Sequence, residues 1–117
     1  MRSEQRLRNR LEFKRVYAEG IKVGGRFVVV FARLREGTSC RLGITATRRC
    51  GNAVERNRAR RRIRELFRHH PEVLTAAPVD LVVNVRAECA RVAWPELEEE
   101  YLACVSRAMR RLARRGS

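Results

Sequence analysis

The chain has 117 residues, 44% of them apolar, which is enough to form a hydrophobic core in one compact domain. The formal net charge is +14, and 25 of the 27 basic residues are arginine, only Lys14 and Lys22 being lysine. This composition excludes a disordered chain, and so many like charges call for a polyanionic partner, either nucleic acid or an anionic membrane surface. No stretch approaches the roughly 20 apolar residues of a membrane-spanning helix.

The four cysteines, at positions 40, 50, 89 and 104, are too far apart in sequence for a zinc knuckle. The basic N-terminus MRSEQRLRNR is followed by no apolar segment, so a secretory signal is not expected. We therefore expect reduced, mostly buried thiols in a cytoplasmic protein.

The first predicted element is a helix over residues 9–19. Asn9 can cap its N-terminus with Glu12 as the reciprocal partner, and Gly20 can end it. One side of this helix is an apolar stripe of Phe13, Val16 and Tyr17.

Two strands are predicted next, over residues 26–34 and 40–48, with a turn at 36–39 between them. Both faces of the first strand are apolar. The second alternates, with a core face of Cys40, Leu42, Ile44 and Ala46 and an open face of Arg41, Gly43, Thr45 and Thr47. Because a short turn joins the two strands, we expect them to pair as an antiparallel hairpin. The pattern also leaves room for a short strand near 21–23.

The second half of the chain predicts a helix over 53–69, a strand over 79–86 and a helix over 95–113. Residues expected to face inward are Val79, Leu81, Val83 and Val85 in the strand and Leu97, Tyr101, Cys104, Val105, Ala108 and Leu112 in the last helix. The order of elements predicts one α/β or α+β domain, a small sheet with helices packed on it, over residues 1–117.

The helix over 53–69 lies in the segment GNAVERNRARRRIRELFR, residues 51–68, which contains seven arginines. Helical periodicity places Ala59, Ile63, Leu66 and Phe67 on one face, which we expect to pack on the sheet. Almost opposite lie Asn57, Arg61, Arg64 and Arg68; Arg58 and Arg60 flank them, and Arg56 and Arg62 lie nearer the core boundary.

The polar face of this helix carries essentially one sign of charge, because only Glu55 and Glu65 oppose the arginines. Like charges this close destabilise a helix unless a polyanion neutralises them. Nucleic acid is favoured over a membrane, because the apolar face is needed for the core. Asn52 can cap the helix after Gly51, and Arg48 and Arg49 extend the basic surface.

The segment TRRCGNAVERNRARRRIRELFR closely resembles the arginine-asparagine-arginine motif of the bacterial ribonuclease P protein subunit. LEFKRVYAEG, RLGITATRR and the order of elements are similar to that family too, so the resemblance covers nearly the whole chain. It implies an α+β two-layer sandwich: a four-stranded mixed sheet packed by three helices, like a ribosomal small-subunit protein domain. It also implies a left-handed βαβ crossover through the arginine helix.

The resemblance further implies a function. Such proteins bind a catalytic RNA, one to one and with no other protein required, and together they remove the 5′ leader of precursor tRNA. The active site and its Mg²⁺ ions belong to the RNA, and the protein holds the leader in a cleft. Residues implied to bind the catalytic RNA are Arg48, Arg49, Asn52, Arg56, Asn57, Arg58, Arg60, Arg61, Arg64 and Arg68.

For the leader cleft, the resemblance implies Phe13, Tyr17 and Phe31, with Lys14 and Arg41 nearby. Aromatic platforms beside basic side chains suit single-stranded RNA, although periodicity alone would place these aromatic residues in the core. The chain departs from the family pattern in having arginine for lysine in the motif, Cys50 for an aliphatic residue and Tyr17 for a frequent phenylalanine.

Two other functions fit parts of the pattern: a structural RNA-binding protein such as a ribosomal subunit, and a self-sufficient nuclease. For the nuclease, His69 and His70 are the candidate acid-base residues, but adjacent helical residues point about 100° apart. A helix C-terminus favours basic residues in any case, and the acids at 96–100 suit a helix N-terminus. We expect no catalytic residues and no certain metal ligands in this chain.

Overall fold

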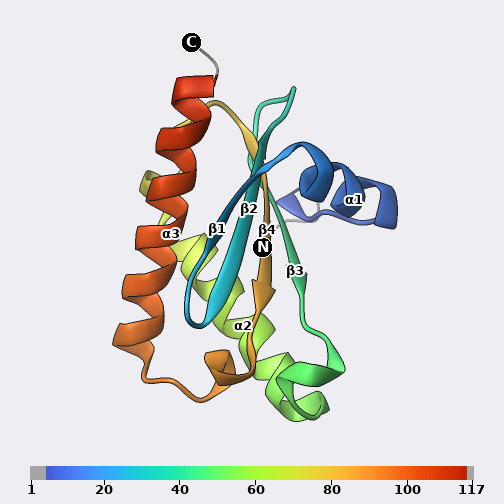
Figure 1. Ribbon diagram of the computed structural model, residues 1–117, viewed down its shortest axis with the longest axis vertical. Helices are drawn as coiled ribbons and strands as arrows, with labels where there is room; N and C mark the ends of the chain where they lie inside the picture. The colour runs from blue at the N-terminus through green and yellow to red at the C-terminus, as the bar shows by residue number, and fades with distance from the viewer. Residues whose placement is uncertain (1–4, 116–117) are drawn as a thin grey trace.

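The computed structural model describes residues 5–115, in which three helices pack on a four-stranded sheet (Figure 1). Residues 1–4 and 116–117, which the predicted domain includes, lie outside the described part. The helices and strands follow in the order α1 (Arg10–Glu19), β1 (Ile21–Gly24), β2 (Val28–Leu34), β3 (Arg41–Thr45), α2 (Ala53–His69), β4 (Val79–Val85) and α3 (Trp94–Arg115). Short 3₁₀ turns are η2 (Arg48–Cys50), η3 (Pro71–Val73) and η4 (Ala87–Ala90).

The strand order in the sheet is β1-β2-β4-β3. The pairs β1–β2 and β2–β4 are antiparallel, whereas β3 and β4 are parallel. The predicted antiparallel hairpin of residues 26–34 with 40–48 is therefore wrong, because β4 lies between the two strands.

The composition of β4 explains why it takes the central position. Its residues are buried on both faces, whereas β3 carries Gly43 and Thr45 on its second face. A salt bridge fixes the neighbours, because Asp80 in β4 accepts two hydrogen bonds from Arg41 in β3, at 2.7 and 2.9 Å. Short sequence separation favoured the hairpin, but burial of β4 and pairing of Asp80 outweigh it.

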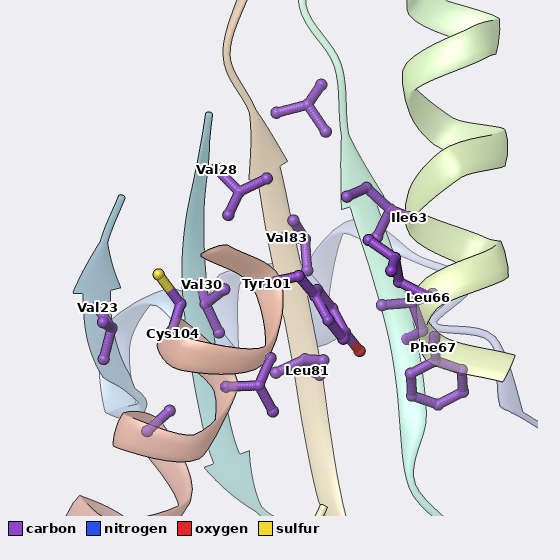
Figure 2. Close-up of a cluster of buried hydrophobic side chains, with 14 of the residues drawn as sticks. Val23, Val28, Val30, Ile63, Leu66, Phe67, Leu81, Val83, Tyr101 and Cys104 are labelled. Carbon is purple, nitrogen blue, oxygen red and sulfur yellow. The ribbon is translucent and has the colours of Figure 1, made fainter. Parts of the chain in front are cut away.

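The crossover from β3 through α2 to β4 is left-handed, as the resemblance implied. Figure 2 views the sheet from the side of α2 and α3, and the parallel strands β3 and β4 both point up the page. From β3 on the right, the chain passes through α2 on the viewer's side of the sheet and returns to β4 on the left. Parallel crossovers are right-handed in nearly all proteins, so this connection is an unusual feature of the fold.

The main core lies between the sheet and α2 and α3 (Figure 2). The predicted apolar faces are confirmed: α2 buries Ala59, Ile63, Leu66 and Phe67, and α3 buries Leu97, Tyr101, Cys104, Val105, Ala108, Met109 and Leu112. Three of the four free cysteines are buried and Cys40 is half-buried, which agrees with structural thiols. Burial raises the pKa of Cys89 to about 12.

The opposite face of the sheet is covered in part by α1 (Figure 1). Val16 packs on Val82 and Leu7 in a small second core, with Phe13 and Phe31 partly buried beside it. The predicted capping box forms, because Asn9 accepts from the Glu12 amide and Glu12 accepts from the Asn9 amide. The short α1 leaves the rest of this face uncovered.

Three side chains of α3 hold β1 and the segments on either side of it. The Glu100 carboxylate accepts hydrogen bonds from the backbone amides of Arg26 and Phe27, in the turn between β1 and β2, and of Val28, the first residue of β2. Further along α3, Arg111 donates to the carbonyl of Lys22 and Arg115 to that of Glu19. The helix therefore fixes both the turn and the outer edge of β1.

Predicted boundaries differ from the observed ones mainly around β3. The strand predicted to reach residue 48 ends at Thr45, because η2 turns the chain towards α2. Arg48 and Arg49 therefore lie in this turn instead of at a strand end. The short strand near 21–23 is confirmed as β1.

Candidate nucleic-acid interface

The start of α2 is set by a tight turn and a capping box. Gly51 has φ +128°, which disfavours any residue with a side chain, and a Cβ added there would also lie 2.5 Å from Oε1 of Glu55 and displace that carboxylate from the cap. The Asn52 side chain accepts from the Glu55 amide at 2.9 Å, and Glu55 accepts from the Asn52 amide at 3.3 Å. A hydrogen bond from Arg91 at 2.6 Å lowers the pKa of Glu55. The only carboxylate in the first turn of α2 is thus already engaged.

The basic residues around α2 fall into two groups. The side chains of the first group have no hydrogen bond or ion pair within residues 5–115. This group is called here the α2 arginine surface: Arg48, Arg49, Arg58, Arg61 and Arg64. All but Arg64, which is half-buried, are exposed. Their guanidinium groups are therefore available to an external anion.

The second group is held by the protein itself. Arg68 donates to both carboxylate oxygens of Glu65 at 2.9 Å. Arg60 donates to the Asn57 side chain at 3.2 Å and to the Ala46 carbonyl at 3.4 Å. Arg56 belongs to neither group: it is half-buried, and its buried Nε has no hydrogen-bond partner in the described residues. Of the motif residues, Arg58 and Asn57 are exposed, and Asn52 uses its side-chain oxygen in the cap.

Arg62 has a structural role that matches its predicted place at the core boundary. It donates to the carbonyls of Cys89 and Val92, both at 2.8 Å, and lies over the ring of Trp94 at 5.8 Å. These contacts join α2 to the connection between β4 and α3.

A second candidate surface lies on the uncovered face of the sheet, on the side of α1. It consists of Tyr17, Lys22, Phe31, Thr45 and Asn84 and is called here the open sheet face. The rings of Tyr17 and Phe31 meet edge to face, with centroids 4.8 Å apart. The Tyr17 hydroxyl lies 2.9 Å from Oγ1 of Thr45 and donates to Asn84 at 2.8 Å, and the Lys22 ammonium lies 5.9 Å from the centre of Phe31.

The other residues predicted for the leader cleft make different contacts. Phe13 packs over Gly43, towards the outer edge of β3. Lys14 is exposed beside Leu11, Arg15 and Ala18 on the outer side of α1. Arg41 is bound to Asp80 and Glu12, and the Asp80 hydrogen bond raises its pKa. On this face of the sheet the structure thus brings the Tyr17 and Phe31 rings into contact and places Phe13 over Gly43. Arg41 is engaged by Asp80 and Glu12, and Lys14 lies on the outer side of α1.

Sequence analysis did not single out Lys22, Thr45 or Asn84 as site residues. A signal for Asn84 exists, because Asp80 and Asn84 are the only polar residues in β4 and share one face by strand alternation. Lys22 carries no such signal, because its place beside Phe31 depends on the β1–β2 register.

The two histidines are paired with carboxylates at the end of α2. His69 lies 2.9 Å from Glu65, and His70 lies 2.9 Å from both Glu72 and Glu98. Hydrogen bonds to Glu98 and then Glu72 raise the pKa of His70. The His70 contacts join the end of α2 and η3 to α3. They lie in the helix layer on the side of the sheet opposite the open sheet face. From residue 5 to residue 115, no three His, Cys, Asp or Glu side chains cluster as metal ligands would.

The fold and its surfaces define a class: a small, strongly basic α+β protein with a left-handed crossover and an exposed arginine helix. The protein-family profile described as Ribonuclease P matches residues 1–109, and the chain therefore belongs to the ribonuclease P protein family. None of the helices within residues 5–115 has the length and apolarity needed to cross a membrane.

Related proteins cover nearly the whole chain. The ribonuclease P protein component of Kocuria rhizophila is 36% identical over 95% of this chain and 97% of its own length. That of Symbiobacterium thermophilum is 38% identical over 92% of this chain and 94% of its own length.

Solved structures agree with the fold. The RNase P protein of Thermotoga maritima superposes with a TM-score of 0.78 at 32% identity, covering 87% of this chain and 96% of its own. The Staphylococcus aureus RNase P protein gives 0.78 at 27% identity, covering 90% and 97%.

The different environments of neighbouring arginines predict different effects on stability. Changing Arg62 to alanine should lower the free energy of unfolding by about 2 kcal/mol, because two carbonyls lose a charged donor and the Trp94 contact is lost. Changing Arg61 to alanine should leave it within roughly 0.5 kcal/mol of the parent protein. Urea unfolding followed by circular dichroism measures both. Equal effects would show that Arg62 does not anchor the β4–α3 connection.

Proposed function

We propose that this chain is the RNA-binding subunit of ribonuclease P, which holds the catalytic RNA on the α2 arginine surface and the 5′ leader of precursor tRNA on the open sheet face. The observation that carries the proposal is a set of unpaired arginines around a helix whose other side is locked into the core. Membership of the ribonuclease P family supports it, because relatives that match the chain over nearly its full length are named ribonuclease P protein components.

The α2 arginine surface suits the backbone of a folded RNA. Arginine offers planar donors that match pairs of phosphate oxygens, and within residues 5–115 no carboxylate forms an ion pair with these side chains. The helix α2 carries three of these arginines at intervals of three residues: Arg58, Arg61 and Arg64. The surface continues in η2 with Arg48 and Arg49. Because α2 is anchored by four buried side chains, the charges are held in place before RNA arrives. Little conformational entropy is then lost on binding.

The open sheet face suits single-stranded RNA. Phe31 is half-buried and Tyr17 is 37% exposed, so both rings are supported from below while part of each remains accessible. The Tyr17 hydroxyl is fixed by Thr45 and Asn84, which holds the ring in one orientation. A base stacked on such a ring contributes roughly 1–3 kcal/mol, and Lys22 lies close enough to meet the adjoining phosphate.

In this proposal the chemistry belongs to the RNA. Mg²⁺ held mainly by the RNA subunit supplies the activated water and stabilises the leaving oxygen. The residues of this chain bind, orient and neutralise charge: the α2 arginine surface docks the catalytic RNA, and the open sheet face positions the leader. We expect one protein per RNA, no further protein partner and action in the cytoplasm.

Reconstituted cleavage tests this function. Purified protein alone should leave the precursor tRNA intact, whereas adding it to the cognate catalytic RNA should restore leader removal at low Mg²⁺ concentration. The physical reason is that the protein adds cationic charge and leader affinity that high Mg²⁺ otherwise supplies. The measurement is the rate of 5′-leader release across a Mg²⁺ titration.

A variant with Arg58, Arg61 and Arg64 changed to alanine provides the control for this assay and should fail to restore cleavage at low Mg²⁺. Leader removal by protein without RNA would instead identify a self-sufficient nuclease. Tight RNA binding with no effect on the ribozyme would favour a structural role such as that of a ribosomal protein.

Salt dependence tests the docking surface separately. Changing Arg61 and Arg64 to alanine should weaken binding to the catalytic RNA and flatten the plot of log affinity against log salt by roughly 0.7–0.9 per lost phosphate contact. Arg107→Ala with Arg110→Ala removes the same charge from exposed positions of α3 and serves as the matched control. An identical change of slope in both double variants would mean that only net charge matters.

The open sheet face is tested by leader dependence. Changing Phe31 to alanine should weaken binding of leader-bearing precursor tRNA to the reconstituted enzyme by roughly 5- to 150-fold, the equivalent of one lost stacked base. Mature tRNA should bind with nearly unchanged affinity, because it has no leader to stack. A comparable loss for precursor and mature tRNA would place the contribution of Phe31 in folding alone.

A further inference from the structure

We propose that the outer edge of β3 carries a binding site for one unpaired nucleobase, read by the backbone of Ile44 and walled by Phe13. The inference rests on the proposed function, because the base would belong to an RNA docked on the α2 arginine surface. It goes beyond that function in naming a pocket between α1 and α2, separate from the open sheet face, and the chemical groups it recognises.

The site is a hollow of about 180 Å³ at the β3 edge. Leu7 and Phe13 form one wall, residues 42–44 form the floor, and Arg6, Arg60 and Arg64 form the rim. A drug-sized ligand needs roughly 300–1,000 Å³, so this hollow suits a single flat ring system. The Phe13 ring lies directly on the backbone of Gly43, since a Cβ added there would lie 2.6 Å from its Cζ atom. Gly43 therefore allows the ring to form this wall.

The free hydrogen-bonding groups at this edge can be assigned from strand geometry. The Leu42 carbonyl points outward, because it accepts from the Leu7 amide at 3.0 Å. Ala46 also presents its carbonyl outward, to Arg60 at 3.4 Å. In a parallel ladder both backbone groups of one residue face the same edge, alternating along the strand, so Ile44 presents its N–H and C=O outward between these two. The backbone N–H and C=O groups of the alternate residues form the hydrogen bonds to β4: Arg41, Gly43 and Thr45.

The segment before α1 cannot cover Ile44. It runs beside β3 only as far as Leu7, with one bridge from Arg6 to Leu42, and then leaves the edge because Asn9 caps α1. Leu7 and Arg60 occupy the carbonyls on either side of Ile44. An added β-strand needs several consecutive free peptides, and here only one is free, which disfavours a protein strand as the occupant.

The remaining chemistry fits a nucleotide. The N–H and C=O of one residue, Ile44, offer a donor and an acceptor side by side, which match the adjacent acceptor and donor on the Watson–Crick edge of an unpaired base. Phe13 offers a surface for the base, and Arg6, Arg60 and Arg64 offer cations for its phosphate. No carboxylate lines the hollow among the described residues, so charge complementarity favours an anionic ligand.

The proposal is tested by amide NMR of the whole protein with an adenosine pentanucleotide as the probe. Binding should shift the Ile44 amide and the Arg60 and Arg64 side-chain signals, while the amides of residues 96–100, at the acidic start of α3, stay in place. A pentanucleotide of N6,N6-dimethyladenosine, whose base stays uncharged but whose Watson–Crick edge is blocked, should shift the arginine signals but not Ile44. Equal Ile44 shifts with both probes, or none with either, overturn the inference.

Variants give a second readout by fluorescence titration with the unmodified probe. Ile44→Pro removes the outward N–H, and an edge strand tolerates proline at such a position. The control is Ile44→Ala, because alanine also lacks the isoleucine side chain but keeps the N–H. Proline should weaken binding at least five-fold more than alanine, and equal affinities overturn the inference. If the proline variant does not fold, the comparison of blocked and unblocked probes decides.

The outcomes also separate this inference from the proposed function. Arginine shifts without an Ile44 response leave RNA docking on α2 intact and remove the base site. Absence of any response, at low salt and with either probe, counts against RNA binding by this surface and so against both.

Discussion

The packing of α2 on the sheet is the constraint on which the rest of the molecule depends. Ala59, Ile63, Leu66 and Phe67 are buried, and this apolar contact holds a row of like charges that would otherwise weaken the helix. Gly51 and the Asn52–Glu55 capping box fix where the helix begins, and Arg62 fastens its middle to the segment before α3. The fold therefore holds the side chains of the α2 arginine surface at the protein surface without pairing them with carboxylates.

The second layer is organised by charge as well as by apolar contact. Arg41 joins Asp80 in the central strand to Glu12 in the first turn of α1, so a buried carboxylate, a guanidinium and a helix start form one network. Asp80 is only 3% exposed, and leaving it unpaired in the interior would be costly. This network fixes one end of α1, and Tyr17 fixes the other through Thr45 and Asn84. The aromatic face between them is thereby held in shape.

Sequence periodicity predicted the helices and their buried faces well, because each depends on local spacing: α2 ends at the expected residues and α3 buries the expected stripe. Strand neighbours could not be predicted in this way. The β2–β3 hairpin was wrong because β4, distant in sequence, is the more completely buried strand and contains the partner of Arg41. The crossover hand came from the family resemblance alone. In the candidate site, helical periodicity placed Arg58 and Arg61 on the solvent-facing side of α2. The position of Lys22 beside Phe31 could not be predicted in this way, because it depends on the register between β1 and β2.

The two edge strands of the sheet, β1 and β3, differ in how their backbone groups are covered, and this difference affects whether two copies can pair edge to edge. Exposed strand edges are templates on which a second chain can add. Arg111 of α3 donates to the backbone carbonyl of Lys22 in β1, and Arg115 donates to that of Glu19 at the end of α1, just before β1, so positive charge lies along that edge. Another copy approaching there would have to displace these donors and bring two cationic helices together. The arginine-rich end of α3 therefore disfavours edge-to-edge pairing of two copies at β1.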